Sequence, residues 1–110
     1  MIRAGLLALW SALMMIVAAA AAMTASTPST EGYMAAMEKM HTNMSVAYTG
    51  DADVDFVRGM LPHHQGAVDM AKVELAYGKD PEVRKLAENV ISSQQKEIEF
   101  MDAWLRAHGQ

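Results

Sequence analysis

The sequence predicts an all-α protein, a small antiparallel bundle of three to four helices. Apolar residues recur at intervals of three and four positions in three separate stretches, which is the pattern of helices with one buried face. Glycine, proline and aspartate lie near the ends of these stretches, where they favour helix boundaries. No stretch alternates apolar and polar residues as a half-buried strand would. The 110 residues are enough for one small domain.

The first expected helix runs from Glu31 to about Tyr48, and Gly50 supplies its natural stop. The segment before it, residues 23–30, is rich in Ser and Thr and contains one Pro. We interpret this segment as a flexible linker that precedes the folded domain.

The second expected helix starts after an N-cap at Asp51 or Asp53 and extends to about Tyr77. Gly78 follows it and is suited to the left-handed conformation that often ends a helix. Both helix ends are therefore predicted from residues whose backbone or side-chain chemistry favours a boundary.

Pro62 lies inside this second helix. A proline there cannot donate a hydrogen bond to the carbonyl four residues earlier, and its ring clashes with that carbonyl, so we expect a kink or break near residues 58–61. A mild kink leaves three helices in total. A break makes residues 53–60 a separate short helix and leaves four.

The third expected helix begins with Asp80 as N-cap and Pro81 in its first position, and its apolar pattern continues to Gly109. The short turn before it predicts that the second and third helices form an antiparallel hairpin, with the first helix packed across it. The helical domain is expected to span residues 31–110.

Residues 1–22 have the features of a secretory signal peptide. Arg3 supplies a positive charge, the run from Ala4 to Ala22 is almost entirely apolar, and its last residues are small enough for a cleavage site. We therefore expect an exported protein, periplasmic in a bacterium, with cleavage after Ala22. The alternative is an uncleaved anchor, because the run approaches the ~20 apolar residues that span a bilayer.

Charge and cysteine content limit the partners. Removal of residues 1–22 takes away Arg3 and no acid, so the net charge moves from −4 to −5. Nucleic acid and anionic lipid become poor partners, whereas cations are favoured. The chain has no cysteine, which excludes thiolate zinc sites, iron–sulfur clusters and covalently attached haem. Methionine is the soft ligand that remains.

Two clusters of histidine and methionine have the composition of a metal site. The second and third helices contribute Met60, His63, His64, Met70, Glu97 and Met101. The first helix contributes Met34, Met37, Met40, His41 and Met44. The members of the first-helix cluster share one helix face, with Met40 at its edge. Soft sulfur beside imidazole selects copper over magnesium, calcium or manganese, so copper is the expected ligand.

Each cluster also has a structural interpretation. A methionine stripe is a common filler of helical cores, and a single exposed histidine is commoner than a ligand. Glu97 can be a solvated charge, and His108 is expected on the surface near the C-terminus. His63 and His64 point about 100° apart in a regular helix. Both reach one ion only if Pro62 re-aims a ring; otherwise each serves a different site.

The segments at residues 60–71, 77–83 and 94–101 closely resemble the bacterial domain-of-unknown-function family 305, to which CopM-type exported copper-binding proteins belong. The Met-Leu-Pro-His-His block that begins at Met60 is the most specific part of this resemblance. The resemblance covers about residues 51–105 and implies a ferritin-like helical bundle and, in the characterised branch, copper bound by Met and His. By position it singles out Met60, His63, His64, Met70 and Met101, with Glu97 as a further candidate.

The leading hypothesis is an exported copper-binding protein that sequesters or transfers Cu(I), with Cu(II) as a second form. Its expected partners are copper ions, another copper-handling protein and further copies of the same chain. One alternative is a noncovalent haem bundle with axial ligands from a first-helix Met and His108. Another is a methionine-rich structural or interaction bundle without metal.

Catalysis has no positive signal in the sequence. There is no glycine-rich phosphate loop and no arrangement that activates a nucleophile or separates an acid from a base. A di-iron carboxylate enzyme would use two Glu-x-x-His motifs and two further glutamates, whereas this chain offers one motif, at Glu38 and His41. We therefore expect a binding protein and not an enzyme.

Overall fold

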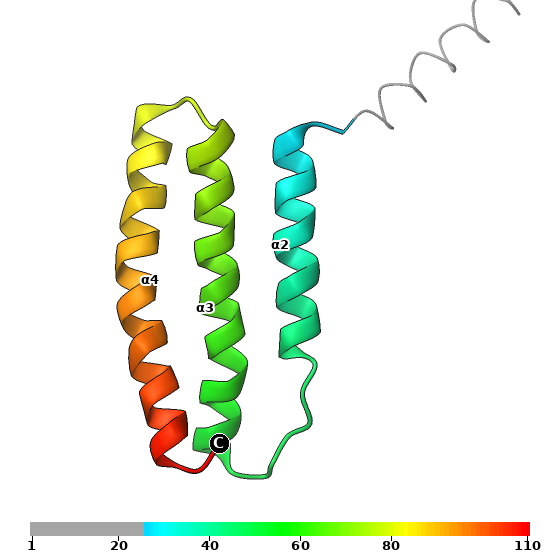
Figure 1. Ribbon diagram of the computed structural model, residues 1–110, viewed down its shortest axis with the longest axis vertical. Coiled ribbons are helices and arrows are strands. Elements are labelled where there is room, and N and C mark those ends of the chain that lie inside the picture. Colours follow the sequence, from blue (N-terminus) through cyan, green and yellow to red (C-terminus); the bar gives the residue numbers. More distant parts are fainter. Residues whose placement is uncertain (1–25) are drawn as a thin grey trace, which may run out of the picture.

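The computed structural model describes residues 26–110, which form three helices and, within that range, no strand (Figure 1). The helices are α2 (Pro28–Met44), α3 (Ala52–Tyr77) and α4 (Pro81–Ala107). The predicted all-α class is therefore confirmed. The predicted signal peptide, residues 1–22, lies outside the described residues. Within residues 26–110, none of the helices combines the length and hydropathy that a membrane crossing requires.

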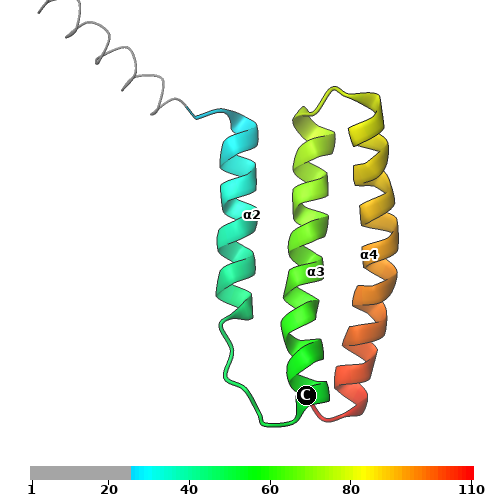
Figure 2. The ribbon, with the colours of Figure 1, turned by 180° about the vertical axis from the view of Figure 1, so that it is seen from behind.

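The helices lie side by side with α3 in the middle, as two opposite views show (Figures 1 and 2). The chain passes down α2, up α3 and down α4. α3 lies close to both neighbours, whereas no Cα atom of α2 comes within 8 Å of a Cα atom of α4. The first helix was expected to pack across the hairpin of the other two, but its backbone lies along α3, and only side chains such as Tyr33 and Asn43 border hollows that α4 also lines. The result is an open layer of helices, which leaves much of each outer helix facing solvent.

α2 begins three residues earlier and ends four residues earlier than expected. Its N-cap is Thr27, whose side-chain oxygen accepts the backbone N–H of Thr30 at 3.3 Å, and Pro28 occupies the first turn. Proline is favoured there because its missing N–H has no helical partner in the first turn anyway. The last part of the predicted linker is therefore helical. At the other end, the N–H of Ser45 bonds the carbonyl of His41 at 3.2 Å and closes the helix.

A short turn with dense hydrogen bonding joins α2 to α3. Gly50 was expected to end the first helix, but α2 already ends at Met44. With φ 90°, Gly50 instead forms part of the turn. Asp51 is the N-cap of α3 and accepts the backbone N–H groups of Asp53 and Val54. Of the two caps predicted, Asp51 is the one formed. The Asp55 carboxylate accepts both the N–H and the hydroxyl of Thr49, at 2.8 and 2.9 Å.

α3 continues through Pro62 without interruption, so the described chain has three helices and not four. The missing bond from Pro62 to the Arg58 carbonyl weakens one turn, but neighbouring helices pack against α3 on both sides and hold it. Gly78 ends α3 with φ −70° and ψ 153°, an extended conformation and not the left-handed one predicted. Its N–H bonds the Glu74 carbonyl at 2.6 Å. Asp80 caps α4 as predicted.

The core is thin and is made largely of small residues. Val68 on α3 is the most enclosed side chain, at 2 % exposed. The α2–α3 contact depends on two glycines, Gly32 against Val73 and Gly66 against Met40. A Cβ added at Gly66 would lie 2.7 Å from the Met40 sulfur. Small residues let two helix backbones approach closely, and this contact therefore sets the distance between α2 and α3.

Gly66→Ala is expected to destabilise the domain by about 1 kcal/mol, because the overpacking cost exceeds the ~0.5–1 kcal/mol that alanine gains over glycine in a helix. Gly59 in the same helix is the matched control, since an added Cβ there meets nothing within 4 Å. Gly59→Ala should stabilise by ~0.5–1 kcal/mol. Thermal unfolding followed by circular dichroism separates the two, at ~4–8 °C per kcal/mol. A rise in melting temperature for both variants would contradict the close contact at Gly66.

Asp55 predicts a pH-dependent contribution to stability. The pKa of this carboxyl is lowered from its usual 3.8, first by the Thr49 backbone N–H, with a smaller opposing effect of desolvation and further lowering by the Thr49 hydroxyl and Gly50 N–H. A lowered folded-state pKa stabilises the domain above pH 3.8, and this contribution disappears as the pH falls through the lowered value. The difference in unfolding midpoint between the native chain and Asp55→Asn should therefore narrow from pH 6 to pH 2. A constant difference would show that the Thr49 contacts do not favour the charged form.

Candidate metal centre

One histidine and one glutamate meet across α3 and α4. The Nε2 of His64 is in direct contact with the Oε2 of Glu97. The His64 side chain is 12 % exposed, while Glu97 is 61 % exposed. The carboxylate of the pair is therefore exposed to solvent, whereas the imidazole is enclosed by protein. An ion from solvent can reach the pair from the side of Glu97.

The backbone of α3 orients the imidazole. His64 Nδ1 lies 3.0 Å from the carbonyl oxygen of Met60, one helical turn earlier, and donates to it when protonated. Histidines that bind metal through one ring nitrogen usually donate the other N–H to a carbonyl or carboxylate, which fixes the ring and its tautomer. This contact leaves Nε2 as the nitrogen presented to Glu97. A proton can bridge the pair, and once it leaves, a nitrogen lone pair and a carboxylate oxygen face the same point.

Two methionines lie one turn from the pair, on the same side. Met60 precedes His64 by one turn and Met101 follows Glu97 by one turn, and α3 and α4 run in opposite directions (Figure 1). Both thioethers therefore occupy the next level of the α3–α4 contact. Met101 is only 6 % exposed, and Met60 is half-buried. The predicted ligands Met60, His64, Glu97 and Met101 thus gather at one contact; we call them the α3–α4 site.

An unpartnered amide oxygen lies on the other side of Glu97. Gln94 Oε1 is buried and has no hydrogen-bond partner within the described part of the chain. Gln94 is three residues before Glu97 on α4, so the two side chains lie on neighbouring turns of one face. A buried oxygen without a partner is costly and is often matched by a water or an ion. Gln94 was not among the predicted ligands. The only feature of the sequence that pointed to it was its position one turn before Glu97.

His63 does not join the α3–α4 site. Because α3 stays regular through Pro62, the two adjacent imidazoles point in different directions, with ring centroids 6.4 Å apart and planes at 61°. His63 is exposed, and Met70, which is 42 % exposed, lines a different hollow with Val83 and Leu86 of α4, more than one turn along α3 from His64. Pro62 therefore does not re-aim a ring, and any role of His63 and Met70 as ligands belongs to a different place on the molecule.

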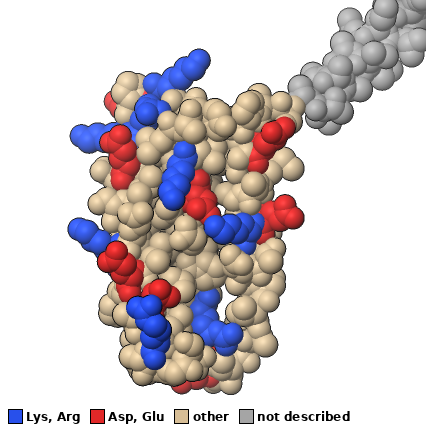
Figure 3. Space-filling view, viewed as in Figure 1, with Lys and Arg blue, Asp and Glu red and all other residues tan. Residues whose placement is uncertain are grey.

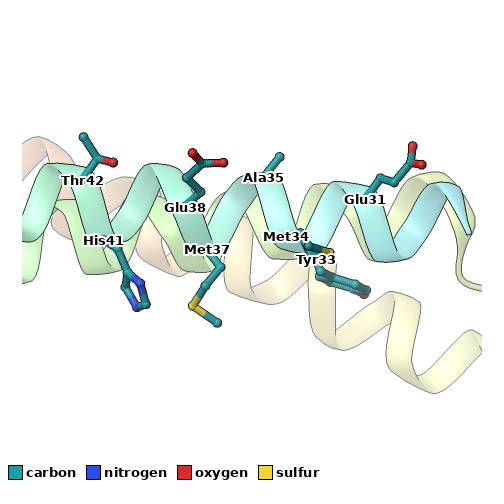
Figure 4. A pocket seen from close by; sticks show the side chains of 8 residues that line it. All are labelled: Glu31, Tyr33, Met34, Ala35, Met37, Glu38, His41 and Thr42. Carbon is teal, nitrogen blue, oxygen red and sulfur yellow. The ribbon is translucent and has the colours of Figure 1, made fainter. Parts of the chain in front are cut away.

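The first-helix cluster is divided. Met40 faces α3 and packs against Gly66, so its sulfur is part of the helix contact. Four others are exposed and lie beside or beyond that contact: Met34, Met37, His41 and Met44, of which Met44 is one turn after Met40 and lies nearest to it. Figure 4 shows Met34, Met37 and His41 projecting to one side of the helix, together with Tyr33. We call the four the α2 stripe. Because α3 lies between α2 and α4 and no Cα atoms of these two helices come within 8 Å, the α2 stripe and the α3–α4 site are separate groups.

Charge and donor counts narrow the metal chemistry. Among residues 26–110, no group of three or more His, Asp or Glu side chains gathers closely enough to hold an ion. The α3–α4 site therefore has one nitrogen and one carboxylate donor, and its other nearby donors are thioether sulfur and the Gln94 amide. Thioethers suit soft ions and serve hard ions such as Mg²⁺ poorly. On the face seen in Figure 3, acidic and basic side chains are interspersed, so no field of one sign covers that face.

The fold and the site define a class of small α-helical proteins with imidazole, carboxylate and thioether groups at a helix–helix contact. A family model described as Domain of unknown function (DUF305) matches residues 4–109, and the chain belongs to this family. The chain is also similar to an uncharacterized protein of Acanthamoeba polyphaga mimivirus, with 42 % identity over 53 residues. That match covers 48 % of this chain and 35 % of the viral protein, so the chain spans about a third of its relative.

Replacement of Glu97 by Gln is expected to hold His64 in the Nδ1–H tautomer. The Gln amide can donate to Nε2, while Nδ1–H continues to donate to the Met60 carbonyl. Long-range ¹H–¹⁵N spectra of Glu97→Gln, recorded with His64 neutral, should show a protonated Nδ1 at this residue, with exposed His63 as reference in the same spectrum. A protonated Nε2 would mean that the Met60 carbonyl does not orient the ring.

Proposed function

We propose that this is an exported copper-binding protein of the periplasm that sequesters or transfers Cu(I) and Cu(II) in copper homeostasis. The observation that carries the proposal is the His64–Glu97 contact, with its oriented imidazole and with Met60 and Met101 one turn away. The ferritin-like antiparallel bundle and the cleaved signal peptide of residues 1–22 are parts of the same proposal. The proposal also includes His63 and Met70 as further copper ligands.

The donor set favours copper for two reasons. Imidazole with thioether suits copper, whereas hard cations take oxygen ligands. The same site can serve both oxidation states, because thioethers favour Cu(I) while His64 and Glu97 favour Cu(II). The absence of cysteine also fits an oxidising compartment, where thiols would form disulfides and methionine remains available as a soft donor.

Binding and release would be coupled to a proton. A cation at Nε2 takes the place of the proton that joins His64 to Glu97, so copper uptake releases that proton whenever it is present. The Met60 carbonyl keeps the ring aimed throughout, because it bonds the opposite nitrogen. Glu97 is the exposed partner and lies where copper enters or passes to another protein. No part of this sequence of steps requires bond chemistry on a substrate, in line with a carrier and not an enzyme.

The haem alternative lacks comparable support. It pairs a methionine of α2 with His108 as axial ligands, but α3 lies between α2 and α4 (Figure 2). His108 is stacked on Trp104, with centroids 3.8 Å apart, and its Nδ1 donates to the Trp104 carbonyl at 2.7 Å. A metal-free interaction bundle remains the second candidate, since large apolar side chains such as Phe56 and Phe100 are more than half exposed.

His64→Ala is expected to weaken copper binding at the α3–α4 site at least tenfold, since loss of an outer-shell partner alone commonly costs about 10–100-fold. Glu97→Gln should weaken Cu(II) more than Cu(I), because carboxylate is the harder donor. Anaerobic titration of Cu(I) against a chromophoric competitor, and a parallel Cu(II) titration, measure both.

Glu99→Gln is the matched control, because it makes the same charge change on the same helix at an exposed position away from His64. It should bind both ions as the native chain does. Circular dichroism verifies that each variant is folded. Unchanged affinity in folded His64→Ala, and in the His63→Ala/His64→Ala double variant, would reject the α3–α4 site as the copper site. A native chain that binds neither ion would reject the proposed function and favour the interaction bundle.

A further inference from the structure

The α2 stripe is left unexplained by the α3–α4 site. Its three methionines are unusually exposed for large apolar side chains: Met34 at 65 %, Met37 at 45 % and Met44 at 39 %. Burial of a large apolar side chain stabilises a fold, and none of the three obtains this stabilisation in full. The stripe is therefore not the core filler that a methionine pattern on a helix usually indicates.

The core-facing side of α2 is made by other residues. Gly32, Ala36 and Met40 follow one another at intervals of four, and they are the positions that meet α3. The stripe has its own intervals of three and four. Met44 is one turn after Met40 and lies at the edge of the core-facing row, whereas Met34, Met37 and His41 lie on the remaining circumference. The stripe thus contributes little to the packing of this chain. Core packing therefore does not explain why it consists of methionine and histidine.

The geometry of the stripe suits chelation along one helix. Residues three and four apart on a helix face lie about 5–6 Å apart at Cβ, so long thioether side chains from neighbouring turns can reach one ion. Met34, Met37 and His41 are spaced in this way, and Met44 continues the row. Met34, Met37 and His41 line a shallow hollow on the surface of α2 (Figure 4). The donors are on one rigid element, so binding needs no movement of α3 or α4.

The hollow is lined by soft donors and by carboxylates. Figure 4 shows Met34, Met37 and His41 projecting to one side of α2, with Glu31 and Glu38 projecting to the other, although all five residues line the hollow. Glu38 is three residues before His41 and four after Met34, so it is a neighbour of both on the helix surface. The α2 stripe itself offers three thioethers and one imidazole. Thioethers favour Cu(I) over Cu(II) and other harder divalent ions.

We propose that the α2 stripe is a second binding site, selective for Cu(I) and independent of the α3–α4 site. This inference rests on the proposed function and deepens it by assigning different ions to different parts of the fold. The α3–α4 site, with imidazole, carboxylate and an enclosed methionine, serves both oxidation states. The α2 stripe, with exposed ligands on an outer helix, binds Cu(I) and is open to direct exchange with a partner.

The test compares two variants of the exported protein. Met37→Leu with His41→Gln removes two adjacent donors of the stripe, and it retains the fold because both positions are exposed and leucine and glutamine are good helix formers. His64→Ala removes the other site. The control, Glu88→Gln with Ser92→Ala, changes two exposed residues of α4 that do not line the hollow. Anaerobic Cu(I) titration gives the stoichiometry, and ¹³C-methyl spectra with redox-inert Ag(I) identify the methionines that respond.

The native chain and the control should bind two Cu(I) per chain, and either variant should bind one. Ag(I) should shift the methyl signals of Met34, Met37 and Met44 in His64→Ala. If the native chain binds one Cu(I), lost in His64→Ala and kept in the stripe variant, the second site is wrong and the proposed function stands. If the stripe variant keeps two, the second site is likewise wrong. If the single ion is lost only in the stripe variant, the stripe binds Cu(I) and the α3–α4 site is wrong.

Discussion

The packing of α3 between two helices is the constraint on which the rest of the structure depends. α3 alone contacts both neighbours, and Val68 at its centre is the most enclosed side chain of the described chain. Gly66 sets how closely α2 approaches, because the Met40 side chain fills the space that a Cβ would take. The same central position keeps α3 continuous through Pro62, since packing on two sides offsets a missing backbone bond.

This arrangement also divides the candidate metal ligands into two groups. A continuous α3 directs His64 toward α4 and leaves His63 on a different side, so adjacent residues in the sequence are not adjacent as ligands. Because α3 keeps α2 away from α4, the methionines of the first helix cannot complete the His64–Glu97 pair. One helix in the middle therefore produces two groups of donors, one enclosed at a helix contact and one exposed along an outer helix.

Local hydrogen bonds explain how a small domain without a disulfide keeps these groups in place. Asp51 and Asp80 cap α3 and α4, and Asp55 gathers three donors from the turn that precedes α3. Each cap satisfies N–H groups that would otherwise be unpaired at a helix start. At the α3–α4 site, the Met60 carbonyl does the same for one nitrogen of His64 and leaves the other available. Here the backbone of a helix orients a side chain for binding.

The sequence by itself determined the helical class, the cap Asp80 and the approximate extent of the third helix, because apolar spacing and capping chemistry are local. It limited the cap of α3 to Asp51 or Asp53, and the structure has Asp51. It also indicated which residue types carry donors. It misplaced both ends of α2, where Ser and Thr residues resemble a linker although Thr27 caps a helix. Only the tertiary structure decided that Pro62 is tolerated, that Met40 packs against Gly66, and that His64 meets Glu97. These outcomes depend on which helix lies beside which, and periodicity along one chain carries no information about that choice.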